Sequence, residues 1–418
     1  MKTSMMLCCL LAVMTLNTYA SDLLVEEFGL APAYPSISAA VAAANDGDRI
    51  IIKNRNGNAP WIENVTVNKS VQFLPFTNDT FFIVQGAYTI VPADNREITI
   101  VGMRNLAGNI TGTAAGNVTA RTKLNIMGSL LQSGSVLISA NGYNVNTVHT
   151  VFANGGLLIR AGSIVGCDIT TNANSSAIAI VPETAVTSDV VKIIGNRVNN
   201  MSPTTAAFGI AWTSSTHFFD IRNNLVYTRN IGIAVSKSRV LNTVTNRLSN
   251  NTVSITGAVT TANVYGVSIS TNSANSIVEV MNNLVDLNST SSSNIFGITN
   301  VSAVPSVTFI YNTVDEDIAA NRRTTGTFST NSNNNFAAVV LAPDGNIQGA
   351  GGLNMGNPAA PYYDLDLTVN DCGAYGGGFS LNNYFPIHAG AARIYMVTVP
   401  ANVRVGGTIS IQADGYDR

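Results

Sequence analysis

A repeat of about 30 residues in the middle of this chain restricts its possible folds more than any other feature. It is marked by an Asn column whose members lie 28, 27, 32 and 29 residues apart: Asn196, Asn224, Asn251, Asn283 and Asn312. Three positions before each Asn stands an apolar residue, and two positions after each stands Val. The apolar residues are Ile193, Ile221, Leu248, Val280 and Phe309, and the valines are Val198, Val226, Val253, Val285 and Val314. One more unit fits upstream, with Ile164, Cys167 and Ile169 in these three columns. A chain with this period is expected to build its core by stacking similar units.

A second column, of small residues flanked by apolar ones, lies between the Asn positions: Ala177, Gly209, Gly232, Gly266, Gly297 and Ala337. Each unit therefore contains at least two short strands of period two, joined by turns rich in Asn, Ser and Thr. Such a unit is long enough to run once around a coil and to stack on the next coil at about 4.8 Å. Asn tolerates the left-handed backbone of a strand corner, and stacked Asn side chains hydrogen-bond to one another, so we expect a structural Asn ladder. Ligand binding by these Asn residues is the alternative.

Both ends of the chain carry a resemblance. Residues 34–52 contain an Ala-rich stretch that Ser36 can N-cap, followed by the run from Trp61 to Val71. The run from Tyr363 to Gly377 is similar to the closing segment of secreted bacterial β-helix proteins. Together with the repeat, these segments resemble the right-handed parallel β-helix (pectin-lyase-like) superfamily over roughly residues 30–380.

The resemblance implies an all-β solenoid of about ten coils, with an N-terminal capping helix that covers the open end of the stack. We expect this domain to span residues 21–380. The alternating apolar residues between Ile394 and Ala413 predict a short β-hairpin or added strand within a C-terminal appendage of residues 381–418.

The N-terminus predicts secretion. Lys2 precedes an apolar stretch from Met5 to Leu16, and small residues stand at Thr18 and Ala20. This pattern is typical of a signal peptide, residues 1–20, cleaved before Ser21. No later segment is apolar for 18 residues, so we expect no membrane span. The chain has 22 basic and 24 acidic residues, without the basic excess that nucleic-acid binding needs, so nucleic acid is not an expected partner.

Two cysteines remain after removal of the signal peptide, which takes Cys8 and Cys9. Cys167 and Cys372 would lie many coils apart, too far for a disulfide, so we expect two free thiols. Cys167 occupies the Asn column and is therefore expected to be a small buried residue rather than a reactive one.

An outward column four positions before each Asn alternates in charge: Lys192, Asp220, Arg247, Glu279 and Thr308. Opposite charges at strand spacing attract, so the column predicts a salt-bridge ladder that fixes the register of the coils. A catalytic interpretation remains open. Asp220 and Glu279 two coils apart would have carboxyl groups roughly 9–10 Å apart, near the upper limit for an inverting glycosidase, with Arg247 between them.

A candidate carbohydrate-binding surface lies in the same coils: Trp212, His217, Phe218, Asp220, Arg222 and Tyr227. Phe218 is expected to face outward beside Asp220 and Arg222, so that a sugar can stack on the ring, while Phe219 faces the core. The coils from 189 to 250 are basic, with seven Lys and Arg against two Asp, and those from 251 to 321 are acidic. The basic coils could attract an anionic polysaccharide, or the two patches could simply cancel.

Active-site motifs of the superfamily are mostly missing. Asp315 to Asp317 follow Asn312-Thr313-Val314, where a polygalacturonase would carry Asn-Thr-Asp, and the Arg-x-Pro-x-x-Arg context of pectate lyases is absent. No metal site is predicted: Asp364, Asp366 and Asp371 could be read as calcium ligands, but they fit better as carboxylates that cap backbone amides in a closing turn. We therefore expect no cofactor. The sequence favours a secreted or cell-surface protein that binds an extracellular polysaccharide or is structural, with a polysaccharide lyase or glycoside hydrolase as the alternative.

Overall fold

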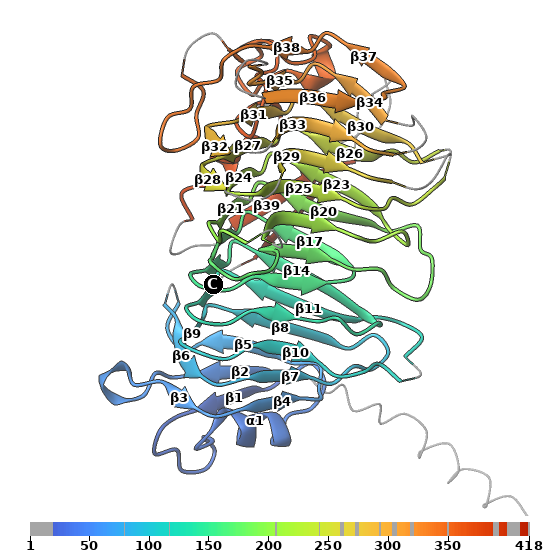
Figure 1. The fold of residues 1–418 in the computed structure, drawn as a ribbon. Helices are drawn as coiled ribbons and strands as arrows, with labels where there is room; N and C mark the ends of the chain where they lie inside the picture. Colours follow the sequence, from blue (N-terminus) through green and yellow to red (C-terminus); the bar gives the residue numbers. More distant parts are fainter. Residues whose placement is uncertain are drawn as a thin grey trace, which may run out of the picture.

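The computed structural model describes residues 20–416 except 79, 117, 205–206, 242, 260–262, 272–275, 292–293, 303–306, 318–321, 349–350, 388–392 and 399–409. The chain winds into a stack of coils, and each complete coil contributes one strand to each of three parallel sheets (Figure 1). The expected parallel β-helix is therefore confirmed, with 11 to 13 strands per sheet rather than about ten coils. The predicted signal peptide, apart from Ala20, lies outside the described residues.

The strands of the three sheets are as follows. The first sheet contains β1 (Asp22–Val25), β2 (Arg49–Ile52), β5 (Gln72–Pro75), β8 (Glu97–Val101), β11 (Thr122–Met127), β14 (Tyr143–Val148), β17 (Gly162–Val165), β20 (Val190–Ile194), β23 (Phe218–Arg222), β26 (Asn246–Ser249), β30 (Val278–Met281), β34 (Val307–Ile310) and β37 (Thr330–Ser332). The second contains β4 (Val65–Val67), β7 (Tyr88–Ile90), β10 (Ile110–Gly112), β13 (Val136–Leu137), β16 (Leu157–Ile159), β19 (Ile178–Ile180), β22 (Phe208–Trp212), β25 (Ile231–Val235), β29 (Val264–Ile269), β33 (Ile295–Asn300) and β36 (Arg322–Gly326). The third contains β3 (Trp61–Ile62), β6 (Phe82–Gln85), β9 (Met103–Asn105), β12 (Leu130–Leu131), β15 (Val151–Phe152), β18 (Asp168–Thr171), β21 (Arg197–Asn200), β24 (Leu225–Thr228), β27 (Thr252–Ile255), β31 (Leu284–Asp286), β35 (Thr313–Val314) and β38 (Asn335–Phe336).

One apolar core fills the coils from Leu23 to Val314 without a break. At its N-terminal end lies α1 (Ile37–Ala43), whose Ser36 Oγ accepts a hydrogen bond from Ala39 N at 3.1 Å, as the sequence predicted. Ile37, Ala40 and Val41 are the buried residues of this helix, so the helix caps the open core. Three short 3-10 helices complete the set of helices in the described part: η1 (Asn56–Asn58), η2 (Ala360–Tyr362) and η3 (Leu381–Asn383). None of the described helices is long and apolar enough to cross a bilayer.

The Asn column forms a continuous buried ladder. Asn196 Nδ2 donates to Asn224 Oδ1 at 2.8 Å, and the same bond recurs at 2.9 to 3.0 Å through Asn251, Asn283 and Asn312 to Asn334. The left-handed backbone lies one residue earlier than expected: Gly195, Asn223, Asn250, Asn282 and Tyr311 have positive φ. The ladder Asn residues therefore serve as hydrogen-bonding residues, and their predecessors make the turn.

The column of small residues is explained by the valine column. A Cβ atom on Gly209, Gly232, Gly266 or Gly297 would lie 2.2 to 2.4 Å from Cγ1 of Val226, Val253, Val285 or Val314, respectively. The two columns thus pack directly against each other inside the coil. Ala337 is an exception, because it follows β38 of the third sheet and does not lie in this column.

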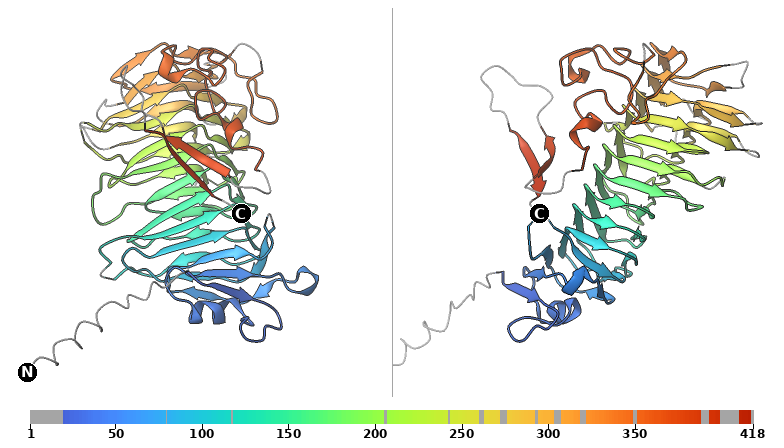
Figure 2. Two further views of the ribbon diagram at one scale, coloured as in Figure 1. Left: turned by 180° about the vertical axis from the view of Figure 1, so that it is seen from behind. Right: turned by 90° about the vertical axis from the view of Figure 1, so that its left-hand side faces the viewer.

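The coils end at Phe336, earlier than the predicted boundary at 380. Residues 337–348 and 351–387, here called the C-terminal segment, return along the side of the stack, and Figure 2 shows them beside the coils. The predicted hairpin follows as β39 (Arg393–Thr398) and β40 (Gln412–Tyr416), which pair antiparallel. A further short parallel pair, β28 (Gly257–Val259) and β32 (Ser289–Ser291), lies outside the three sheets.

Both described cysteines are buried free thiols, as expected. Cys167 occupies the ladder column, where its N–H donates to Asn196 Oδ1 at 2.8 Å. Cys372 belongs to the C-terminal segment, and its Sγ contacts Tyr311 O at 3.2 Å. Burial raises the pKa of each thiol to about 12, so neither is a reactive thiolate at neutral pH.

Candidate functional site

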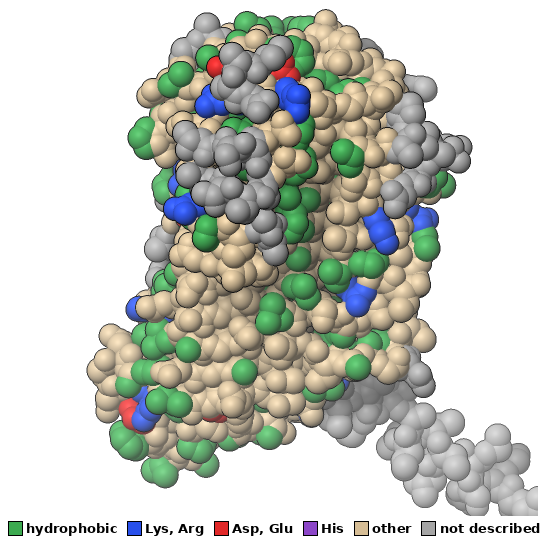
Figure 3. All heavy atoms as spheres, viewed as in Figure 1, with side chains coloured by type: hydrophobic (Ala, Val, Ile, Leu, Met, Phe, Trp, Pro, Cys, Tyr) green, Lys and Arg blue, Asp and Glu red, His purple; other side chains and the backbone are tan. Residues whose placement is uncertain are grey.

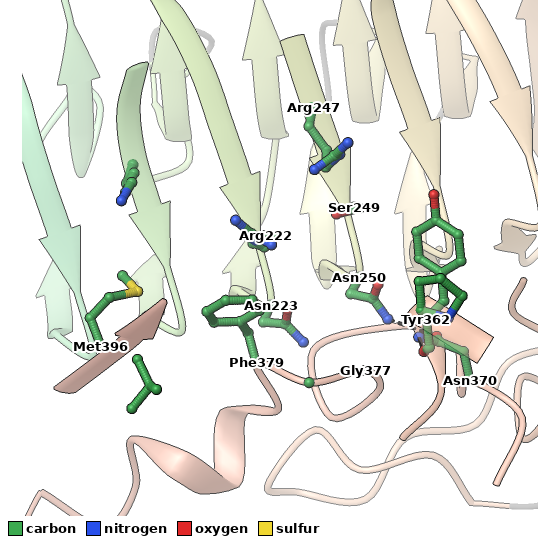
Figure 4. A pocket seen from close by; sticks show the side chains of 14 residues that line it. Arg222, Asn223, Arg247, Ser249, Asn250, Tyr362, Asn370, Gly377, Phe379 and Met396 are labelled. Carbon is green, nitrogen blue, oxygen red and sulfur yellow. Dashed lines mark hydrogen bonds between the residues drawn. The ribbon is translucent and has the colours of Figure 1, made fainter. Parts of the chain in front are cut away.

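A groove of about 520 Å³ separates the coils from the C-terminal segment (Figure 4). Its coil wall carries three basic side chains from successive strands of the first sheet: Lys192 on β20, Arg222 on β23 and Arg247 on β26. The opposite wall comes from the C-terminal segment and the hairpin, with Tyr362, Asn370, Phe379 and Met396. The groove thus combines charged, amide and aromatic groups from segments far apart in the sequence.

The predicted outer column exists in the expected register, since Lys192 pairs with Asp220, Asp220 with Arg247 and Arg247 with Glu279. The ladder of ion pairs is only partly as predicted. Arg247 Nε donates to Glu279 Oε1 at 3.0 Å. Asp220, however, is bound by Arg222, two residues along the same strand. A two-residue spacing on one face lets the long Arg222 side chain reach back to its neighbour.

Arg222 lies at the centre of the groove, beside Phe379 in Figure 4. Its guanidinium carbon is 4.1 Å from the centre of the Phe379 ring, a cation–π contact. Burial lowers the pKa of Arg247, but the attraction of Glu279 and its hydrogen bond outweigh burial and hold the pKa above its usual value. Arg247 therefore stays charged, and each of the two arginines is partly neutralised by a carboxylate. Lys192 forms no ion pair or hydrogen bond with the described residues, so it is the uncompensated cation of the groove.

Asp220 and Glu279, the pair that a hydrolase would use, are each held in an ion pair with an arginine. No group of three or more His, Cys, Asp or Glu residues in the described part of the chain is arranged to hold a metal ion. The residues considered as calcium ligands bond instead to nearby groups of their own segment. Asp364 accepts from Asp371 N at 3.0 Å, Asp366 from Thr368 N at 3.0 Å and Asp371 from Asn354 N at 2.6 Å.

Three predicted sugar-binding side chains have no exposed surface: Trp212, His217 and Phe218. Trp212 packs inside the coil, with its ring centre 5.1 Å from that of Phe219. Phe218 faces outward, as expected, but the guanidinium of Arg239 covers it at 5.3 Å. The loop that carries Arg239 follows β25, and no periodic pattern in the sequence indicates where it folds. These rings are therefore not available for stacking on a sugar.

His217 was expected at the surface and is instead fully buried, which corrects that expectation. Its Nδ1 lies 3.1 Å from Thr216 Oγ1, and its Nε2 lies 3.4 Å from Glu183 Oε2. Burial raises the pKa of Glu183, but hydrogen bonds from His217 and Arg121 outweigh burial and hold the pKa below its usual value. His217 is fully buried and Glu183 is nearly so, and Arg121 bonds to Glu183 from another coil, so this cluster is a clamp that holds the loop around Glu183 on the coils.

Tyr227 lies on β24 of the third sheet, away from the groove. The C-terminal segment covers its hydroxyl: a Cβ atom added to Gly345 would lie only 3.0 Å from that oxygen. Burial, with the charge of Asp344 and neighbouring Tyr375, raises the pKa of Tyr227 to about 12. Of the predicted site residues, only Arg222 and Arg247 line the groove, and Asp220 and Glu279 lie behind them as ion-pair partners.

The residues that the sequence did not predict come from the C-terminal segment: Tyr362, Asn370 and Phe379. One signal was present. The coils at 223–224, 250–251 and 282–283 carry Asn-Asn pairs, and the first Asn of each pair binds the segment. Asn223 Nδ2 donates to Gly376 O at 2.6 Å, and Asn250 Nδ2 donates to Asn370 Oδ1 at 2.9 Å.

No family model matches this chain, and neither the curated proteins nor the solved structures contain a significant match.

Proposed function

We propose that this chain is a secreted or cell-surface β-helix protein of the right-handed, pectin-lyase-like type, which binds carbohydrate in its groove without cleaving it. The supporting observation is the groove itself, where Lys192, Arg222 and Arg247 face Tyr362 and Phe379. Sugar rings pack on apolar and aromatic surface while their hydroxyl and acid groups need fixed hydrogen-bond partners, and the two walls supply these separately. Secretion rests on the signal-peptide pattern of residues 1–20.

An anionic polysaccharide is the favoured ligand, since Lys192 is uncompensated while both arginines still have exposed surface. Figure 3 shows the face of the molecule opposite the groove, where charged side chains are few and scattered. A binding site of this kind retains its ligand mainly through a few charged contacts, so it is expected to weaken with salt.

The test is retention of the protein on immobilised anionic and neutral glycans, together with an assay for bond cleavage. Lys192→Gln and Arg247→Gln should each weaken binding of an anionic glycan about tenfold, because each removes one charge-assisted hydrogen bond. Lys123→Gln is the matched control, since Lys123 lies on β11 outside the groove and should bind normally.

The enzyme alternative has its own outcome in the same experiment. Cleavage that disappears in Asp220→Asn or Glu279→Gln would replace the proposal with a polysaccharide lyase or glycoside hydrolase. Equal retention of the wild type and of both groove variants would show that the groove is not the binding site.

A further inference from the structure

The N-terminal end of the stack exposes apolar side chains that belong to neither the core nor the groove. They lie on residues 26–35, here called the end loop, which joins β1 to the capping helix α1 at the end of the stack opposite the last coils (Figure 1). Leu30 is 85% exposed and Phe28 is 78% exposed, and Ala31 and Pro32 beside them are exposed as well. Clustered apolar side chains of this exposure usually mark a binding surface.

The apolar surface continues from the end loop onto the next coils. Lys53 lines a hollow of about 370 Å³ together with Phe28 and Leu30. The ammonium group of Lys53 also lies 5.7 Å from the centre of the Phe76 ring, and Phe76 is 53% exposed. Lys53 therefore connects the two groups of apolar side chains, so Phe28, Leu30 and Phe76, here called the end patch, belong to one surface.

Charged groups are absent from the end loop beyond Glu27, and those before it are paired. No charged residue occurs in the sequence from Phe28 to Asn45, which covers the loop and α1. The three carboxylates before this stretch are each paired with a basic side chain of the next coil: Asp22 with Arg49, Glu26 with Lys53 and Glu27 with Arg55. Because these charges cancel, apolar contact must supply most of the binding energy of the end patch.

The backbone of the end loop needs few hydrogen-bond partners from water. Gly29 N donates to Glu26 O and Ala33 N donates to Leu30 O, each at 2.9 Å, while Pro32 has no N–H group. A segment that enters a bilayer must pair its backbone groups internally, because lipid chains offer no hydrogen-bond partners. The bonds within the end loop therefore reduce the cost of moving this loop out of water.

The chemistry of the end patch fits a lipid surface better than a protein partner. Between Phe28 and Pro35 only Tyr34 has a side chain that can donate or accept a hydrogen bond, and Tyr34 is half-buried. A protein interface combines an apolar centre with a rim of hydrogen-bonding groups, whereas lipid chains require apolar surface alone. The apolar stretch from Met5 to Leu16 also precedes β1, so the end loop lies beside the membrane during the proposed export.

We propose that the end patch attaches the exported protein to a membrane surface without spanning it, with Phe28 and Leu30 inserted at the boundary of headgroups and acyl chains. In this arrangement the axis of the stack points away from the membrane. Lys192 lies on β20, six strands beyond β2 in the first sheet, so at about 4.8 Å per strand the groove is held roughly 29 Å farther out. The inference does not depend on which ligand the groove binds.

Two other exposed leucines differ from the end patch in their charged neighbours. Leu365 and Leu367 of the C-terminal segment are 60% and 79% exposed, but Asp364 and Asp366 stand beside them in the sequence. Hydrogen bonds from Thr368 lower the pKa of Asp366, so this carboxyl is charged at neutral pH. Inserting these leucines would carry a charge into lipid, which is strongly unfavourable. They therefore provide a control of similar exposure.

The experiment is flotation of the exported protein, freed of residues 1–20 as checked by intact mass, with phosphatidylcholine vesicles in a density gradient. We expect the wild type to float with vesicles at about 1 mM lipid and to stay bound in about 0.5 M NaCl, because apolar contact is not screened by salt. Phe28→Ser with Leu30→Ser should weaken vesicle binding at least tenfold, since two large apolar side chains no longer leave water.

The double variant Leu365→Ser with Leu367→Ser is the matched control and should float like the wild type. All four substituted positions are exposed, so unchanged thermal midpoints are expected and would show that both variants are folded. A wild type that stays unbound at about 5 mM lipid would overturn the proposal, and so would an equal loss of binding in the two double variants. Wild-type dimers that dissociate in Phe28→Ser with Leu30→Ser, measured by light scattering without vesicles, would overturn it in favour of an interface between copies.

Discussion

At the level of single residues, the adjacent asparagines of one turn have separate structural roles. In the pair Asn250-Asn251 the first residue has a φ of 52° and binds the C-terminal segment, while the second is fully buried and continues the ladder. Asn251 Nδ2 also donates to Ile221 O at 2.9 Å, so it satisfies a carbonyl of the preceding coil. Buried backbone groups need partners, and the ladder provides them at every turn from Asn196 to Asn334.

The contact between the glycine and valine columns leads to a residue-level prediction. In Gly232→Ala the new Cβ would lie 2.2 Å from Val253 Cγ1 and 2.5 Å from Gly266 O. Strand pairing on both sides fixes the backbone of β25, so the overlap is not easily relieved, and we expect a loss of about 1–3 kcal/mol in the free energy of unfolding. The measurement is the thermal or denaturant midpoint. Gly378→Ala is the control, because a Cβ there meets no atom within 4 Å, and an equal loss in both variants would contradict the explanation.

The coils could be predicted well from the sequence because each coil needs the same types of residue at equivalent positions. Ile193, Asn196 and Val198 recur at equivalent positions, so the core, the ladder and the register could be read from the sequence. The burial of His217 and Phe218 could not be predicted, because it depends on loops around Glu183 and Arg239 that do not repeat. The position of the left-handed residue was missed by one place because Gly195, Asn223 and Tyr311 do not share a side-chain type.

At the level of elements, the C-terminal segment is held by side chains rather than by strand pairing. The sequence of the segment has no periodic pattern, so no helix or strand could be predicted in it. Only its closing turn, with carboxylates that bond to backbone amides, was predicted. Leu381 and Tyr384 of the segment nevertheless complete a second apolar cluster, in which they and Met396 of β39 cover Ile194 and Leu225 of the coils. The segment therefore shields apolar surface that would otherwise be exposed to water.

An element-level prediction separates the docking role of these asparagines from their backbone role. The double variant Asn223→Gly with Asn250→Gly keeps the left-handed turns, which glycine adopts without strain, but removes the amides that bind Gly376 O and Asn370 Oδ1. We expect faster hydrogen exchange in residues 356–377 and little change in the coils. Asn333→Gly, at an exposed turn with a φ of 57°, is the control. If the coils lose protection as strongly as the segment, the two roles are not separable.

At the level of the whole molecule, stability is expected to vary along the axis of the stack. Repeat folds depend on contacts between neighbouring coils, so their ends and their less supported coils open at lower free energy. Hydrogen-bonding side chains occupy the ladder column from Ser129 onward, whereas Met103 stands there one coil earlier. Hydrogen bonds from the C-terminal segment and hairpin to the coils run from His149 to Tyr311. The middle coils are therefore stabilised by the hydrogen-bonding ladder and by the C-terminal segment with its hairpin, and the first coils do not share these two sets of contacts.

From this asymmetry we predict that the coils of residues 49–105 exchange their amide hydrogens before the coils of residues 190–285, although one apolar core runs through both. The capping helix α1 slows this opening because Glu63 Oε1 and Oε2 accept from Ile37 N and Ser38 N, each at 2.9 Å. Glu63→Ala should therefore speed exchange in the first coils several-fold and leave the middle coils unchanged, since removing these bonds loosens the end of the stack. Native-state hydrogen exchange followed by mass spectrometry measures both regions in one sample. Equal exchange in the two regions, or a response to Glu63→Ala along the whole stack, would mean that the coils unfold as a single cooperative unit.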